Sequence, residues 1–94
     1  MVKHVVCFKL KDRTNIGKVK EVLLSMKGNV PQIIDMEVGV DFLQSERSYD
    51  VMLTELLKDK TDLENYQNDP YHCTVVKTYM HSVRESSIAV DYEI

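Results

Sequence analysis

Two side chains able to do chemistry stand six residues apart in the stretch from Thr61 to Val83: Tyr66 and His72. His72 opens a series of apolar positions at helical spacing, so its ring is predicted on the buried side of a helix. Burial and a place near a helix start both favour the neutral imidazole, which can act as a general base. The alternative is a core histidine whose ring bonds a backbone carbonyl or a water, and both interpretations stay open.

Tyr66 and His4 are predicted to face the same interior space as His72. Tyr66 follows Leu63 by three positions in a short helix, so its hydroxyl points inward and is able to donate to, or protonate, a carbonyl oxygen. His4 lies among apolar residues on one side of the first strand. A core built only for stability seldom desolvates two histidines, although each ring taken alone also fits a structural role. His81 lies off the apolar stripe and is expected to be solvated.

Two helix-start signals surround this pair. Thr61 to Glu64 has the form of a capping box, in which the threonine side chain bonds an amide of the first turn. Asp69 followed by Pro70 is the second signal, because aspartate caps free amides and proline fits the first helical position. A short helix, a kink and a longer helix are therefore predicted, with Tyr66 before the kink and His72 after it.

The remaining elements follow from hydrophobic periodicity. Residues alternate as strands over 2–10, 32–42 and 49–57 and again from Ser86 or Ser87 to Ile94, and a helical stripe runs over 16–26. The order is βαββαβ, which predicts an α+β, ferredoxin-like fold with one domain over residues 1–94. Right-handed crossovers then place both helices on one face of a four-stranded antiparallel sheet.

The other face of that sheet is predicted to be apolar and uncovered. Val5, Cys7, Ile33 and one apolar side of the third strand are expected to point there. Exposed surfaces of this kind usually meet a partner, and a second copy in a two-fold dimer is the simplest cover. We therefore expect a homodimer that packs sheet against sheet.

Composition excludes several classes of partner. The 94 residues hold 12 Lys and Arg against 15 Asp and Glu, a net charge of −3 without a basic stripe, so no nucleic acid is expected. No segment approaches the roughly 20 apolar residues of a membrane span. The first apolar run is too short for a signal peptide, and the two cysteines are interpreted as reduced, so we expect a cytoplasmic protein.

No metal or cofactor is predicted. The chain has no glycine-rich phosphate loop and no nucleophile elbow, and its cysteines lack metal-ligand spacing. Two inward histidines without a suitably placed inward carboxylate make a poor metal site, and Asp69 is better used as a cap.

Five short motifs, in order along nearly the whole chain, resemble the stress-responsive α/β-barrel (Dabb) domain family. They are Val2-Lys3-His4-Val5-Val6 with Phe8-Lys9-Leu10, Glu37-Val38-Gly39, Tyr49-Asp50-Val51, Tyr66-Gln67-x-x-Pro70-x-His72 and Val90-Asp91-Tyr92-Glu93. The resemblance implies a ferredoxin-like fold that dimerises through its sheets into an α/β barrel. The family is functionally mixed, and it includes a plant polyketide cyclase that works with a tyrosine and a histidine.

By motif, the resemblance places those acid-base roles on Tyr66 and His72 and a pocket-lining role on His4. Many relatives have His-Pro-x-His where this chain has Asp69-Pro70-Tyr71-His72, so we expect the large Tyr71 to narrow the pocket entrance and contact the ligand. The resulting hypothesis is a protein that binds a small keto or aromatic compound. The alternative is a cofactor-independent cyclase, lyase or isomerase that uses the Tyr66/His72 pair.

Overall fold

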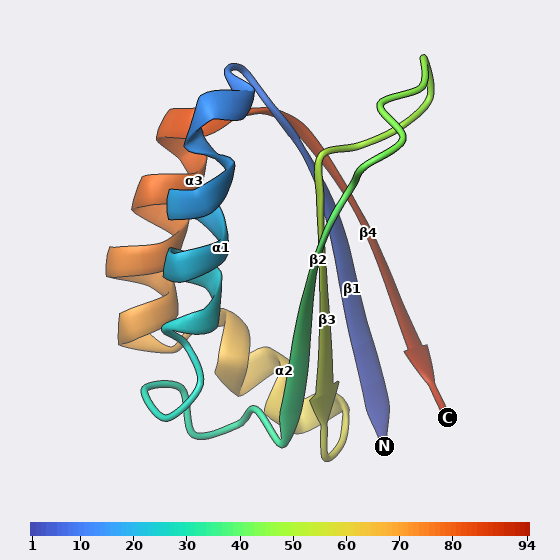
Figure 1. Cartoon of the computed structure of the whole chain (residues 1–94). Coiled ribbons are helices and arrows are strands. Elements are labelled where there is room, and N and C mark those ends of the chain that lie inside the picture. The colour runs from blue at the N-terminus through green and yellow to red at the C-terminus, as the bar shows by residue number, and fades with distance from the viewer.

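The computed structural model describes all residues 1–94 and shows a four-stranded antiparallel sheet with helices on one face (Figure 1). Its strands are β1 (Val2–Leu10), β2 (Asp35–Val40), β3 (Val51–Leu57) and β4 (Arg84–Glu93). The spatial order is β2-β3-β1-β4, so β1 is central and pairs with both β3 and β4. The predicted α+β, ferredoxin-like fold is therefore confirmed.

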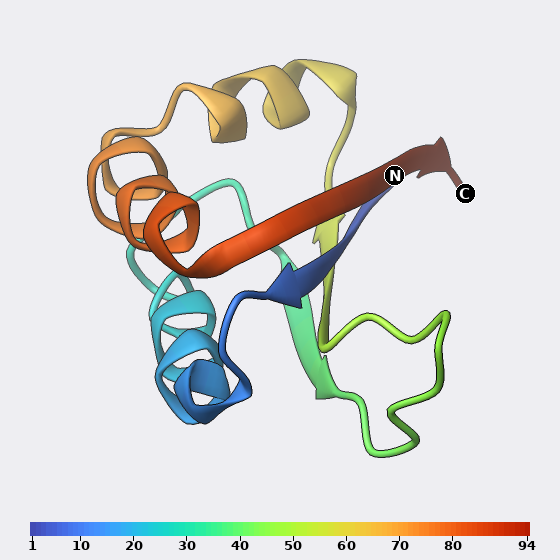
Figure 2. The ribbon, with the colours of Figure 1, turned by 90° about the horizontal axis from the view of Figure 1, so that it is seen from above.

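The helical layer consists of α1 (Ile16–Leu24), α2 (Lys60–Gln67) and α3 (Lys77–Val83). A 3₁₀ turn over Arg13–Asn15 leads into α1, and a π-helical segment over His72–Val76 leads into α3. Helices α1 and α3 lie side by side over the sheet, whereas α2 lies near the end at which β3 finishes (Figures 1 and 2). Both crossovers thus place their helices on the same face, as expected.

The strand boundaries differ from the sequence prediction around residues 41–50. Strands β2 and β3 are shorter than expected, because these residues form a loop that projects away from the helices (Figure 2). Asp50 explains the late start of β3, since its carboxylate accepts from the Leu10 amide and the Arg13 guanidinium, each at 2.7 Å. The last strand begins earlier than expected, at Arg84.

Of the two predicted helix caps, one is wrong and one is confirmed. Asp59, not Thr61, caps α2: its carboxylate accepts from the Asp62 amide at 2.8 Å, so the helix begins at Lys60. Asp69 caps the next helical stretch as predicted, and its Oδ1 accepts from the His72 amide at 3.1 Å. An aspartate directly before a helix satisfies the same free amides as a capping box.

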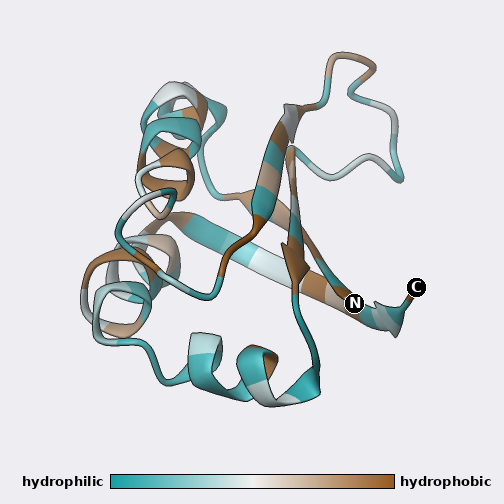
Figure 3. Ribbon diagram, turned by 90° about the horizontal axis from the view of Figure 1, so that it is seen from below, coloured by the Kyte–Doolittle hydropathy of each residue, from teal (hydrophilic) through white to brown (hydrophobic).

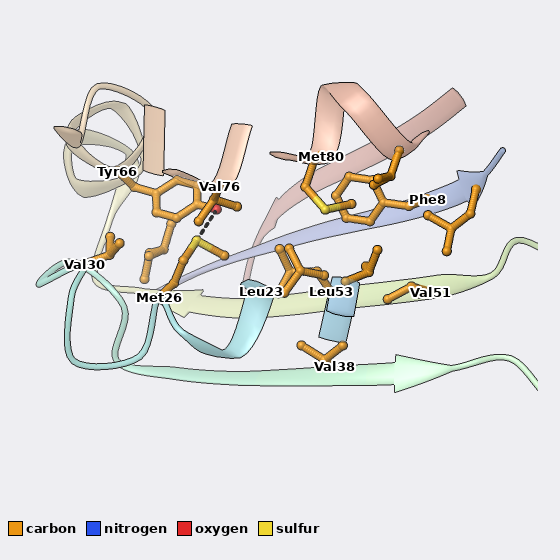
Figure 4. Packing of buried hydrophobic residues seen from close by; sticks show 14 of the residues in the cluster. Phe8, Leu23, Met26, Val30, Val38, Val51, Leu53, Tyr66, Val76 and Met80 are labelled. Carbon is orange, nitrogen blue, oxygen red and sulfur yellow. Dashed lines mark hydrogen bonds between the residues drawn. The ribbon is translucent and has the colours of Figure 1, made fainter. Parts of the chain in front are cut away.

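The core fills the space between the sheet and the helices (Figure 4). Phe8 and Leu53 from the sheet meet Leu23 of α1 and Met80 of α3 in this layer. Two predicted placements are wrong. Ile33 packs against this core and not on the uncovered face. Val75, which was predicted to be buried in the apolar series that begins at His72, is exposed, because the π-helical turn, in which the Lys77 amide bonds the His72 carbonyl, shifts it away from the buried stripe.

The opposite face of the sheet is apolar and exposed along β4, β1 and β3. In the register, Val90 stands opposite Val5, and Cys7 stands between Ile88 and Met52. Hydrophobic stretches accordingly recur along the strands as well as on the helices (Figure 3). Met52, Ile88, Val90 and Tyr92 have between 43% and 58% of their surfaces exposed. None of the helices is long and apolar enough to cross a membrane.

Candidate functional site

A cavity of about 160 Å³ lies between the inner face of the sheet and the helices. Its wall is mostly apolar, with polar groups at two places. Buried Tyr66 and half-buried His72 stand at one of them. The other is formed by the more exposed Lys77, His81, Arg84 and Ser87, which form the mouth of the cavity. A cavity of about 150 Å³ lined by apolar side chains is able to hold benzene, so this one matches the size of a single ring.

Tyr66 is held by α2 with only 1% of its surface exposed. Its hydroxyl donates to the Met26 sulfur at 3.7 Å (Figure 4). A thioether is a weak acceptor, so the hydroxyl keeps most of its capacity to donate to a ligand. Burial, followed by the negative charge of Glu55, raises the pKa of the Tyr66 phenol well above its usual range. Tyr66 therefore stays protonated and acts as a hydrogen-bond donor.

His72 stacks beside Tyr66, with the two ring centroids 4.4 Å apart and the planes tilted by 32°. Its Nδ1 is buried and has no hydrogen-bond partner in the protein. Burial lowers the pKa of the imidazole, and the charges of Lys77 and His4 lower it further, while Asp69 opposes the shift. The ring is therefore neutral at pH 7, and it lines the ligand-sized cavity.

His4 completes the group from the other side of the cavity. It is buried on β1, its ring centroid lies 5.5 Å from that of Tyr66, and its Nδ1 pairs with the Asp91 carboxylate on β4. Asp91 stands directly opposite His4 in the strand register. A carboxylate in this position fixes the orientation of an imidazole. Nothing in the local sequence pattern of β4 identified Asp91 as the partner of His4.

Glu55 is the buried carboxyl group that the sequence analysis missed. No suitably placed inward carboxylate was expected beside the two histidines, but Glu55 has 0% of its surface exposed and stands opposite His4 in the register of β1 and β3. Neither of its oxygens accepts a hydrogen bond. Burial raises the pKa of Glu55 to about 7, and the nearby Tyr66 hydroxyl opposes the rise. The sequence signal for a buried Glu55 was the alternation of β3, which places Glu55 on the same side as Val51, Leu53 and Leu57.

Tyr71 lies outside this arrangement. It is not among the residues that line the cavity, and its hydroxyl donates to Ser25 Oγ at 2.7 Å, just beyond the end of α1. Tyr71 therefore ties the start of the π-helical segment to α1, and the structure does not place it at the cavity entrance. His4, Tyr66 and His72 are brought together, and no cluster of three or more His, Cys, Asp or Glu side chains is arranged to hold a metal ion.

Solved structures share this fold over their full lengths. A dimeric ferredoxin-like protein of unknown function from Bacteroides fragilis is 26% identical, with a TM-score of 0.84 over 99% of this chain and 95% of that one. A Dabb family protein from Mesorhizobium loti is 19% identical, with a TM-score of 0.76 over 99% and 95%. A hydroxynitrile lyase from Passiflora edulis is 15% identical, with a TM-score of 0.83 over 99% and 92%.

No curated protein matches the sequence closely enough to suggest an activity. The family model does match, and it covers residues 2–94, which include every residue of the cavity described above. The five motifs and the ferredoxin-like fold agree with it. This chain therefore belongs to the stress responsive A/B barrel domain (Dabb) family.

Proposed function

We propose that this protein binds a small keto or aromatic compound in the cavity between the sheet and the helices. The observation that carries the proposal is a ring-sized apolar cavity, about 160 Å³, which has Tyr66 and His72 in its wall. Ligand sites typically combine an apolar lining with a few convergent polar groups. A ring would contact Leu23, Val76 and Met80, and a carbonyl oxygen would accept from the Tyr66 hydroxyl.

The protein is also proposed to be a homodimer whose protomers pack through their uncovered sheet faces. The exposed apolar residues of β3 and β4 support this, as does Phe42, 89% exposed on the projecting loop beside a hollow that Cys7 and Met52 also line. An isologous two-fold contact buries the same patch on both copies. The similar protein from Bacteroides fragilis is described as dimeric.

A second candidate function is cofactor-independent proton transfer, of the kind that cyclases, lyases and isomerases carry out. The favouring observation is the neutral His72 with an unpartnered ring nitrogen, stacked on a tyrosine that stays protonated. His72 would remove a proton from the carbon next to a carbonyl, and Tyr66 would hydrogen-bond the enolate oxygen that forms. The imidazolium would then return the proton to the product.

The binding proposal is tested by calorimetric titration and thermal shift with acetophenone. We expect saturable binding that is weakened about tenfold in Tyr66→Phe, because one hydrogen bond to a ligand contributes on the order of 1 kcal/mol. Tyr71→Phe is the matched control, since it removes a hydroxyl outside the cavity and should leave the affinity unchanged. Equal affinities in the wild type and Tyr66→Phe would remove the assigned donor, and no binding at all would contradict the proposal.

The same ligand separates binding from catalysis. In D₂O, a protein that only binds acetophenone leaves its methyl protons in place, whereas the proton-transfer candidate exchanges them for deuterium. Nuclear magnetic resonance measures this exchange. The candidate requires that His72→Gln abolish it while binding persists, and unchanged exchange in that variant would remove His72 from the mechanism.

A further inference from the structure

We infer that the ligand of this cavity is an organic carboxylate, whose charge is held at the mouth by Lys77 and Arg84. The inference rests on the proposed binding function and adds the charge and the orientation of the ligand. It comes from the distribution of charge around the cavity, which the family fold and the Tyr66/His72 pair do not by themselves imply.

The cavity lining contains cations and no acid. Lys77 and Arg84 line it, and no aspartate or glutamate does. This is unusual for a chain with a net charge of −3, in which 15 acidic side chains outnumber 12 basic ones. The positive mouth is thus a local feature that opposes the overall charge. Clefts lined by one sign of charge concentrate ions of the opposite sign.

Both mouth cations lack an acidic partner within the protein. Arg13, Lys18 and Lys60 each lie within ion-pair distance of a carboxylate, but neither Lys77 nor Arg84 does. The only side-chain hydrogen bond of Arg84 is to Ser87 Oγ at 3.4 Å, which is long and leaves most of its donors free. Guanidinium and ammonium groups without partners at the rim of an apolar cavity fit a planar carboxylate.

The opposite end of the site determines which way such a ligand enters. Glu55 is buried beside Tyr66, and neither of its oxygens has a donor. Glu55 does not line the cavity, but a ligand carboxylate directed inward would lie nearer to this buried acidic group, and like charges repel more strongly in a dry interior than in water. The charge of Lys77 is close enough to His72 to contribute to the lowering of its pKa. The apolar ring therefore points inward, and the carboxylate remains at the mouth beside α3.

Size agrees with this orientation. The cavity holds about one ring, and of the mouth residues Lys77 begins α3 and Arg84 begins β4, directly after that helix ends. An aromatic 2-keto acid would place its ring inward among the core side chains, and its carboxylate, with the ketone directly bonded to it, at the mouth near Lys77 and Arg84. The ligand class is thus a small aromatic or keto monoanion.

The test compares benzoylformate with benzoylformamide, its neutral amide, by calorimetric titration. We expect the wild-type protein to bind the acid about fivefold more tightly, because two partly exposed ion pairs together contribute about 1 kcal/mol. Raising the salt concentration from about 0.02 M to about 0.5 M should reduce this preference, since salt screens exposed charges.

Variants locate the charge that is responsible. In the double variant Lys77→Gln/Arg84→Gln, the preference for the acid should be lost while the affinity for the amide stays the same. The control Lys20→Gln/Lys27→Gln removes the same net charge from exposed positions outside the cavity and should keep the preference.

The outcomes separate this inference from the proposed function. Equal binding of acid and amide would overturn the inference and leave ligand binding intact. A preference that survives in Lys77→Gln/Arg84→Gln, or disappears equally in the control, would also overturn it, because the charge would then act from elsewhere. Absence of binding by both benzoylformate and benzoylformamide, together with no binding of acetophenone, would overturn the proposed function and this inference with it.

Discussion

The two faces of the sheet handle polar and apolar groups in opposite ways. The face that meets the helices buries His4 and Glu55 among apolar neighbours. The other face carries Ile88, Val90 and Met52 and leaves them about half exposed. Both arrangements are costly for an isolated chain, because desolvated carboxyl groups and exposed apolar patches each raise its free energy. The first therefore indicates a small-molecule site, and the second indicates a surface for another protein chain.

The two faces also differ in shape, since one has a cavity and the other has an extended surface patch. The inner face has a cavity that opens at a polar mouth, and its polar groups lie on α2, the π-helical segment, α3, β1 and β4. The outer face is an extended patch across three strands with a projecting loop beside it (Figure 2). Changes on the outer face should therefore alter assembly, and changes on the inner face should alter stability and ligand binding.

The largest effect is expected from a charge placed on the exposed apolar patch of the outer face. Val90→Asp should convert the proposed dimer to a monomer at micromolar concentration, since the two-fold axis buries the new carboxylate twice. We expect the dissociation constant to rise at least about 100-fold, which corresponds to roughly 3 kcal/mol. Light scattering measures the mass. Thr78→Asp, on the exposed side of α3, is the control. A wild-type protein that is monomeric under these conditions would contradict the proposed dimer interface on the outer face.

The next effect concerns Glu55 on the inner face. Its pKa is about 7 in the folded protein against an ordinary value of 4.5, so the folded chain holds more protons than the unfolded chain between these values. The free energy of unfolding should therefore fall as the pH rises from about 4.5 to 7, by about 3 kcal/mol in total. Glu55→Gln cannot ionise, so it should be more stable than the wild type at pH 8 and similar at pH 4.

Urea denaturation across this pH range measures the effect. Glu37→Gln, on the exposed side of β2, is the matched control and should keep the slope of the wild type. A slope that survives in Glu55→Gln would mean that the carboxyl group is not the source of the pH dependence. The two buried Glu55 oxygens, which have no hydrogen-bond partner, would then destabilise the protein less than their burial indicates.

The smallest effect concerns the cap that orients His72. Asp69→Ala should lower the free energy of unfolding by about 1 kcal/mol, the usual cost of losing an N-cap. Asp59→Ala removes the cap of α2 and should cost a similar amount. Only Asp69→Ala should also weaken acetophenone binding, because Asp69 Oδ1 holds the amide of His72 itself. Equal affinities in the two variants would show that the cap contributes stability alone.

Several features of the site were predictable from the sequence because they depend on local pattern. Periodicity placed Tyr66, His72 and His4 on inward faces. In the structure, the ring centroids of His4 and Tyr66 are 5.5 Å apart, and those of Tyr66 and His72 are 4.4 Å apart. The pair Asp69-Pro70 predicted the helix cap at Asp69, whose Oδ1 accepts from the His72 amide in the structure. Tyr71 shows the limit, since residue size and motif position suggested the cavity entrance, whereas its hydroxyl reaches Ser25 on the neighbouring helix.

By itself, the sequence determined the order of the elements and the fold class, because hydrophobic periodicity and turn signals act over a few residues. Its five short motifs carry the resemblance to the family. Only the tertiary structure decided that Glu55 and Asp91 flank His4, since strand register joins residues far apart in the chain. It likewise decided that the apolar side of β4 faces away from the helices and that Val75 leaves the core. These outcomes depend on packing between elements, and no local pattern encodes them.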